Sequence, residues 1–300
     1  MALLEIKGIT KIFTQNKKPD HIVLENMSFT VERGQYVSLL GPSGCGKTTL
    51  LTILGGFLPT DAGEIILSGQ KVETPGPDRG FVFQNYALFP WMTVKENILY
   101  SLQVKKSGKQ EQNERLQELL DISHLHGSEN KYPVQLSGGM QQRVAVVRAL
   151  ASRPEILLLD EPLGAIDFQM RELLQEELAV LVEGAKTTVV MVTHDVNESV
   201  YLSDRVIVMS SDKGRIVQDV RIDLERPRNR QSEGFKAHVS DLTELVRQAF
   251  HEKAVELDSE PGFLKTDASI KRQSSFTEAY NRMSSKYTAI NDSRAAKKYN

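Results

Sequence analysis

The chain has 300 residues, of which 40% are hydrophobic and 25% are charged, and its formal net charge is −2. This length accommodates one large α/β domain with a smaller attachment, or two modest domains, and the near-zero charge offers no bulk electrostatic basis for binding nucleic acid. The single cysteine, Cys45, excludes an intramolecular disulfide and fits a reducing compartment.

The chain opens with predicted strands at residues 3–9 and 22–31, separated by polar turns. The opening residues lack the basic end and apolar core of a signal peptide, and no stretch approaches about eighteen continuous apolar residues, so we expect a cytoplasmic chain without a membrane span. Phe13 would lie at a strand end. An aromatic residue in such a place more often belongs to the core than to a ligand site.

A glycine-rich loop follows the next predicted strand. Residues 36–40 are an apolar run typical of a buried strand, residues 41–48 have the spacing G-x-x-x-x-G-K-T, and residues 50–54 suit the start of a helix. Strand, loop and helix in this order form the context that a phosphate-binding P-loop requires. A chance glycine-rich turn is the alternative, and the complete context disfavours it.

The residue types within this loop match the chemistry of a triphosphate. Gly41, Gly44 and Gly46 permit backbone angles closed to other residues, so that successive N–H groups can point at one anion. The helix that opens after Gly46 adds unsatisfied N–H groups and the positive end of its dipole. Lys47 would neutralise the β- and γ-phosphates, and the Thr48 hydroxyl would ligate Mg²⁺.

Two short strands are predicted at residues 64–67 and 80–83, and Gln84 follows the second one directly. Residues 85–92 are apolar and aromatic but too irregular for a strand or a helix. They form either a buried loop or an exposed apolar patch made for a partner.

From Val94 to about Leu150 the pattern becomes helical, with charged faces. Ser137 is a suitable N-cap for the last of these helices. Gly138 and Gly139 behind it would cost helix stability unless bare backbone is needed there, and bare backbone at a helix N-terminus binds phosphate.

Residues 154–162 form a continuous apolar strand that ends in Asp160 and Glu161. A run that is apolar on both faces indicates a parallel sheet covered on both sides, and the carboxyl ends of such strands are where these sheets bind ligands. Simple solvent exposure of the two acids is the alternative. A P-loop protein, however, needs an acid for Mg²⁺ at this place.

The remaining elements complete the sheet and a C-terminal extension. An amphipathic helix is predicted at residues 170–182, a buried strand at 188–193 and a hairpin from the runs 206–209 and 214–217. His194 lies at the tip of the buried strand, where a lone histidine is more often structural than functional.

Past residue 230 the composition changes. Six apolar residues recur at helical spacing and predict one amphipathic helix: Phe235, Val239, Leu242, Leu245, Val246 and Phe250. From about Asp258 the chain is polar, and we expect a loosely docked or disordered tail.

Taken together, these motifs resemble the ATP-binding subunits of ABC transporters over residues 3–230. The P-loop, the glutamine loop at Gln84, the signature at residues 136–143, the acids at 160–161 and the D-loop at 163–167 all match, and His194 matches the switch histidine. Residues 75–79 and 88–94 are most similar to the nitrate, sulfonate, taurine and bicarbonate importer branch. Phe13 replaces the family's common tyrosine, and the tail is too short and polar for the regulatory domain of maltose-type importers.

The resemblance implies an α/β P-loop NTPase fold with a RecA-like core sheet, an antiparallel β subdomain, an inserted helical subdomain at about 88–152 and a short helical C-terminal tail over 231–300. It implies catalytic roles for Glu161, His194, Gln84 and Lys47, and Mg²⁺ binding by Thr48, Gln84 and Asp160. The residues implied to bind ATP are Phe13, Gly41, Pro42, Ser43, Gly44, Cys45, Gly46, Lys47, Thr48, Thr49, Ser137, Gly138, Gly139 and Asp167.

The resemblance also implies partners. Two such subunits, identical or related, would enclose two ATP molecules head to tail, with Ser137, Gly138 and Gly139 capping the γ-phosphate held by the other subunit. Residues 86–92 would dock on integral membrane permease subunits at the cytoplasmic face of the inner membrane, with a periplasmic substrate-binding protein acting indirectly. No nucleic acid is expected.

Two other functions remain open at this point. A soluble ABC ATPase in DNA repair or translation usually carries long coiled-coil insertions or two cassettes, whereas this chain has one cassette, no long heptad run and no basic stripe. A nucleotide-sensing module without hydrolysis is opposed by the presence of Glu161 and His194.

Overall fold

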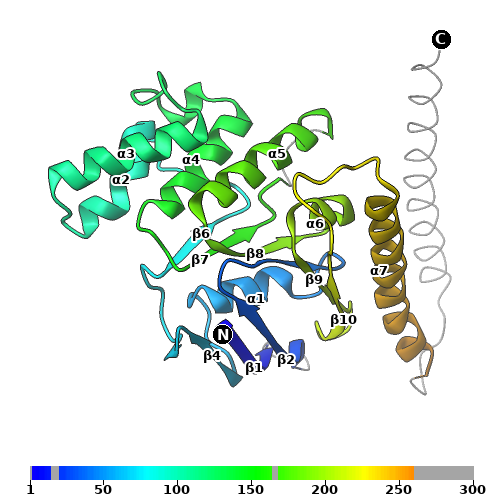
Figure 1. Ribbon diagram of the computed structural model, residues 1–300. Coiled ribbons are helices and arrows are strands. Elements are labelled where there is room, and N and C mark those ends of the chain that lie inside the picture. Colours follow the sequence, from blue (N-terminus) through cyan, green and yellow to red (C-terminus); the bar gives the residue numbers. More distant parts are fainter. Residues whose placement is uncertain (1, 15–19, 164–167, 260–300) are drawn as a thin grey trace, which may run out of the picture. The chain divides into compact units, whose positions relative to one another are not determined.

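The structure, a computed structural model, describes residues 2–14, 20–163 and 168–259 (Figure 1). The chain divides into two compact units, Met1–Lys253 and Ala254–Asn300. Of the second unit only the end of one helix is described, so the polar tail that the sequence predicts lies outside the described residues. Among the helices described, none is both long enough and apolar enough to cross a bilayer.

Two sheets form the centre of the first unit. The antiparallel sheet has the order β2 (His21–Glu32), β1 (Ala2–Phe13), β4 (Ala62–Leu67) and β5 (Gln70–Lys71). The larger sheet has the order β10 (Ile216–Arg221), β9 (Arg205–Met209), β3 (Tyr36–Leu40), β8 (Thr188–Thr193), β7 (Ile156–Asp160) and β6 (Arg79–Val82). All its strands are parallel except β10, which forms the predicted hairpin with β9.

The central strands are buried on both faces, as their continuous apolar runs predict. In β7, Leu157 and Leu159 belong to one hydrophobic cluster, and Ile156 and Leu158 belong to another on the opposite face. This alternation follows from the two-residue period of a strand. The second cluster fills the space between the two sheets together with α1 (Lys47–Leu54).

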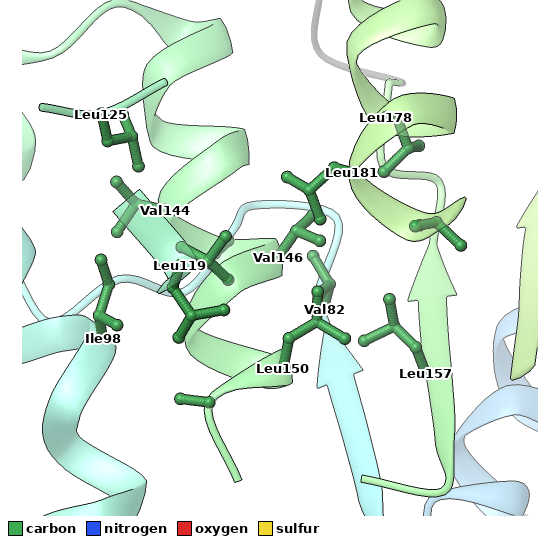
Figure 2. Packing of buried hydrophobic residues seen from close by; sticks show 14 of the residues in the cluster. Val82, Ile98, Leu119, Leu125, Val144, Val146, Leu150, Leu157, Leu178 and Leu181 are labelled. Atoms are coloured by element: carbon green, nitrogen blue, oxygen red, sulfur yellow. The ribbon is translucent and has the colours of Figure 1, made fainter. Parts of the chain in front are cut away.

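The first cluster joins the large sheet to a helical subdomain. Its helices are α2 (Val94–Val104), α3 (Lys109–Ser123), the short 3₁₀ helix η1 (Pro133–Gln135) and α4 (Gly138–Leu150). Figure 2 shows Val82 and Leu157 of the sheet beside Val146 and Leu150 of α4, with Leu119 of α3 and Ile98 of α2 to the left of them. The helical region predicted from the sequence is therefore confirmed.

Three further helices complete the described chain: α5 (Phe168–Ala185), α6 (Val196–Leu202) and α7 (Glu233–Ser259). In α7, Phe235, Leu242 and Ala249 are buried in a third cluster with Leu40 of β3 and strand residues of β9. The compact unit thus includes the first part of α7, whereas the sequence analysis placed this whole helix after the domain.

The predicted helix is confirmed, but Phe250, one of the six apolar residues at helical spacing, does not lie on its buried face, because 41% of the residue is exposed. Ala249 is seven residues after Leu242, which is nearly two helical turns, and so it takes the position that faces the sheet. Phe250 is rotated from Ala249 by about 100° and faces away.

Candidate nucleotide-binding site

The residues that the sequence singled out gather where four parallel strands end. The P-loop follows β3, Gln84 lies two residues after β6, Asp160 ends β7, and His194 follows β8. Since these strands are parallel, their carboxyl ends meet at one edge of the sheet, the place where such sheets bind ligands.

The P-loop backbone requires glycine for two different reasons. Gly44 and Gly46 have φ angles of 83° and 97°, which side chains rarely adopt. Gly46 is also crowded, because a Cβ there would lie 2.8 Å from Leu24 Cδ2. Gly41 has no such angle; its Cβ would lie 2.8 Å from the carbonyl oxygen of Met209, so close packing excludes a side chain.

The side chain of Lys47 is held inside this loop. The residue is 4% exposed, and its Nζ donates hydrogen bonds to the carbonyl oxygens of Gly41 at 2.7 Å and Pro42 at 2.8 Å. A buried ammonium group among backbone dipoles is a site for an anion, because charged phosphate oxygens are stronger acceptors than carbonyl oxygens. Cys45 is buried in the same loop, and burial raises the pKa of its thiol.

Thr48 and Asp160 converge from different elements. The Thr48 hydroxyl donates a 2.9 Å hydrogen bond to Asp160 Oδ1. Burial raises the pKa of Asp160, and the negative charge of Glu161 adds to this effect. The Thr48 hydroxyl and the Asp160 carboxylate offer oxygen ligands of the kind that Mg²⁺ binds. Since burial disfavours the charged form of Asp160, a bound cation would stabilise it. The described residues contain no cluster of three or more His, Cys, Asp or Glu that could hold a metal ion.

Glu161 lies between two other candidate residues. Gln84 Nε2 donates a 3.2 Å hydrogen bond to its Oε2, and His194 Nδ1 lies 3.3 Å from its Oε1. The backbone of Glu161 is left-handed, with a φ of 44°, and its N–H donates to the carbonyl oxygen of Val192. The carboxylate is thereby fixed at the mouth of the P-loop site.

The electrostatics of Glu161 and His194 favour an ion pair. The hydrogen bond from His194 lowers the pKa of Glu161 despite partial burial, and the same bond raises the pKa of His194. Each group therefore stabilises the charged form of the other. A carboxylate can accept a proton, and a histidine ring N–H can donate a hydrogen bond to a phosphate oxygen.

A polar network that the sequence motifs did not predict adjoins His194. Asp195 caps α6 by accepting a hydrogen bond from the Glu198 N–H, and it forms a 3.2 Å ion pair with Arg171 of α5. The Thr193 hydroxyl donates to Glu198 Oε2 and accepts from the Asp195 N–H. The Asp195 to Glu198 spacing is that of an N-cap and its third helical residue, a signal that could have revealed this network.

The signature residues begin α4, as expected. Ser137 is the N-cap, and its hydroxyl accepts a hydrogen bond from the Met140 N–H. A Cβ on Gly138 would meet no atom within 4 Å. Within the described part of the chain, no hydrogen bond or ion pair joins residues 137–139 to the P-loop. Ser137 and Gly138 are exposed at this helix N-terminus, and an exposed helix N-terminus can bind an anion.

Of two further residues predicted to bind ATP, Phe13 and Asp167, the structure describes only Phe13. Phe13 ends β1 and is 38% exposed, so its ring is available to a ligand. Asp167 and most of the D-loop lie outside the described residues.

One part of the loop after Gln84 is buried and another part is exposed. Tyr86 is 7% exposed, which corrects the expectation that it belongs to a docking surface, whereas Trp91 is 70% exposed. Tyr86 and Ala87 have left-handed backbones, and their carbonyl oxygens accept hydrogen bonds of 2.9 and 2.7 Å from Arg148 of α4. Because such backbones are costly for residues with a side chain, this clamp helps to hold the loop in place.

Comparisons with known proteins agree with this geometry. A family model described as ABC transporter matches residues 24–164. The chain is 43% identical to the aliphatic sulfonates import ATP-binding protein SsuB of Bacillus cereus, with 82% of this chain and 95% of that protein covered. It is 44% identical to the bicarbonate transport ATP-binding protein CmpC of Synechococcus elongatus over 75% of this chain and 34% of that longer protein.

A solved structure is similar as well. It is described as the dimeric, post-hydrolysis state of an ATP-binding cassette bound to ADP and Pi. It matches with a TM-score of 0.63 and 34% identity, covering 73% of this chain and 98% of that one.

Proposed function

The chain belongs to the ABC transporter family and is an ATP-hydrolysing importer subunit, and from this we propose how its own residues bind ATP, cleave it and engage their partners. The observation that carries the proposal is the position of Glu161. Its carboxylate is held by Gln84 and His194 beside the loop that contains Lys47.

In the proposed reaction, water attacks the γ-phosphorus of ATP while the bond to the bridging oxygen breaks and ADP leaves. Glu161 orients the water and accepts its proton, a role worth roughly 10²–10⁴ in rate. Lys47 and His194 stabilise the negative charge on the phosphate oxygens. Mg²⁺, held by Thr48 and Asp160 with Gln84 close by, would supply further charge neutralisation when bound.

We propose that the active form is a dimer whose two chains share each nucleotide. Ser137, Gly138 and Gly139 would cap the γ-phosphate bound by the partner, because their helix N-terminus is open and makes no hydrogen bond to its own P-loop among the described residues. A related cassette solved as a dimer bound to ADP and Pi supports this arrangement. Asp167 is proposed to contact the partner chain.

Three aromatic residues form the proposed membrane-facing patch: Phe89, Trp91 and Tyr100. The Phe89 ring lies 5.8 Å from Trp91 and 4.7 Å from Tyr100, and Trp91 and Tyr100 are exposed. We name this set the aromatic patch. Exposed aromatic clusters of this kind mark binding surfaces, and we propose that a cytoplasmic segment of a permease subunit docks here.

The cargo is proposed from the relatives alone. A sulfonate and bicarbonate are the molecules in the names of SsuB and CmpC, and both are small anions. We therefore propose uptake of a small anion, with the ATPase at the cytoplasmic face of the membrane and a periplasmic binding protein delivering the cargo. A soluble ABC ATPase in repair or translation is not favoured, since these relatives are transport proteins.

The test is Glu161→Gln in the full chain. The variant keeps the size of the side chain but replaces one accepting oxygen by an NH2 group and removes the basicity, so we expect phosphate release to fall by about 10²-fold or more while ATP binding remains. Both are measured with purified protein, by a phosphate-release assay and by calorimetry.

Glu155→Gln is the matched control, because Glu155 precedes β7 at the strand's other end and pairs with Arg33. Phosphate release by Glu161→Gln at the rate of this control would show that Glu161 is not the base.

A further inference from the structure

Beneath the ring of Phe13 lies a buried cation. Lys11 is on β1 two residues before Phe13. Lys11 is 6% exposed, and its Nζ lies 5.6 Å from the centre of the Phe13 ring. This distance is within the range of a cation–π interaction.

The cation is fixed by a carboxylate from a distant part of the chain. Asp61 Oδ2 lies 3.1 Å from Lys11 Nζ and accepts a 2.6 Å hydrogen bond from the Ile12 N–H. The Asp61 N–H and the Thr60 hydroxyl both donate to the carbonyl oxygen of Thr10 at 3.0 Å. The end of β1 is therefore held by residues 60–61 through main-chain and side-chain contacts.

These contacts are needed because the end of β1 is irregular. Its pairing with β2 shifts register between Ile9 and Lys11 and again between Lys11 and Ile12. An irregular ladder does not by itself fix the direction of the last side chain. Residues 60–61 follow α1, whose first residue is Lys47, so the same segment links the end of β1 to the P-loop helix.

We propose that Lys11 and Asp61 are positioning residues for the nucleobase: they fix the Phe13 ring and polarise it for stacking on a purine. The inference deepens the proposed binding of ATP and adds to it a contact between Phe13, which the resemblance implies to bind ATP, and the base. A cation on the inner face of the ring draws electron density away from the outer face, which favours an electron-rich purine stacked there. Neither Lys11 nor Asp61 belongs to the P-loop, which would bind the phosphates.

The test compares two ligands with the same phosphates, ADP and inorganic pyrophosphate, by calorimetry on the full chain. Lys11→Met keeps most of the apolar stem and removes the charge. We expect it to raise the Kd for ADP about two- to fivefold, the size of a cation–π contribution, and to leave the Kd for pyrophosphate unchanged. Lys7→Met is the matched control on the same strand, because Lys7 forms an exposed ion pair with Glu5.

Two further variants distinguish a wrong positioning role of Lys11 from a missing contact between Phe13 and the base. Phe13→Ala should raise the Kd for ADP about tenfold, and adding Lys11→Met to it should cause no further loss. If Phe13→Ala weakens ADP but Lys11→Met does not, or weakens both ligands equally, the positioning role is wrong. If Phe13→Ala leaves ADP binding unchanged, the contact between Phe13 and the base is wrong and the inference falls with it, whereas ATP binding by the P-loop is unaffected.

Discussion

At the scale of single residues, Glu198 is a titratable group that the fold buries and that the proposed reaction does not use. It is 3% exposed, Oε2 accepts from the Thr193 hydroxyl, and Oε1 has no hydrogen-bond partner within the described chain. Burial raises the pKa of Glu198 to about 8, and the negative charge of Asp195 adds to the shift against the opposing charges of Arg171 and His194.

This shift predicts a loss of stability as the pH rises. The unfolded carboxyl ionises near 4.5 and the folded one near 8, so the folded state binds one more proton between these values. The stabilising contribution is complete below about pH 4.5 and is lost as the pH rises to about 8. Glu198→Gln stays neutral throughout, so its melting temperature should fall less than that of the wild type between pH 5 and pH 8.5.

Differential scanning fluorimetry at both pH values checks the prediction, with Glu244→Gln as the control because Glu244 is 53% exposed in its pair with Arg247. Equal falls for the wild type and Glu198→Gln would contradict it.

At the scale of elements, the loop after β6 ends in the aromatic patch and is clamped to α4 by Arg148. We expect Trp91→Ala to leave the ATPase rate of the isolated chain within about twofold, because 70% of Trp91 is exposed and its ring lies beside Phe89. Stimulation of the ATPase by reconstituted permease subunits should be lost, since an exposed aromatic anchor is a typical binding hot spot.

Phe250→Ala removes an exposed aromatic side chain from a different element, α7, and serves as the control. Normal co-purification of Trp91→Ala with the permease subunits would rule out docking through the patch.

The helix α7 provides a second prediction at this scale. Leu242 is fully buried against the large sheet, whereas Phe250 on the same helix is 41% exposed. Leu242→Ala should therefore lower the free energy of unfolding in urea by about 2–4 kcal/mol, and Phe250→Ala by much less. Equal losses would mean that the first part of α7 does not pack on the domain.

At the scale of the whole molecule, the proposed shared sites predict that two inactive chains complement each other. Lys47→Ala disables the P-loop of one chain, and Gly138→Asp places a carboxylate at the open signature, where it would repel the partner's γ-phosphate. Neither homodimer then has an intact site, whereas a mixed dimer has one.

The two variants are prepared with Glu161→Gln in every chain and are mixed in equal amounts. The trapped ATP should then reach about one quarter of the amount trapped by the Glu161→Gln chain alone, since half of the dimers are mixed and each mixed dimer has one intact site of two. Retention equal to the average of the two parents would indicate sites contained in single chains. Size-exclusion chromatography with labelled ATP measures the outcome.

Local patterns were sufficient for the elements of the site. Alternating and continuous apolar runs predicted the strands around residues 36–40, 156–160 and 188–193, and the glycine spacing predicted the loop between β3 and α1. These features depend on neighbours in the sequence, namely side-chain periodicity and backbone angles, so they can be read without the fold.

The sequence by itself therefore determined which residue types can hold a triphosphate and the elements that carry them. Only the tertiary structure decided what surrounds them: that Asp61 reaches Lys11 from 50 residues away, that Tyr86 turns inward while Trp91 turns outward, and that Ala249 rather than Phe250 faces the sheet. The physical reason is that burial and ion pairing depend on packing between distant segments, which no local period encodes.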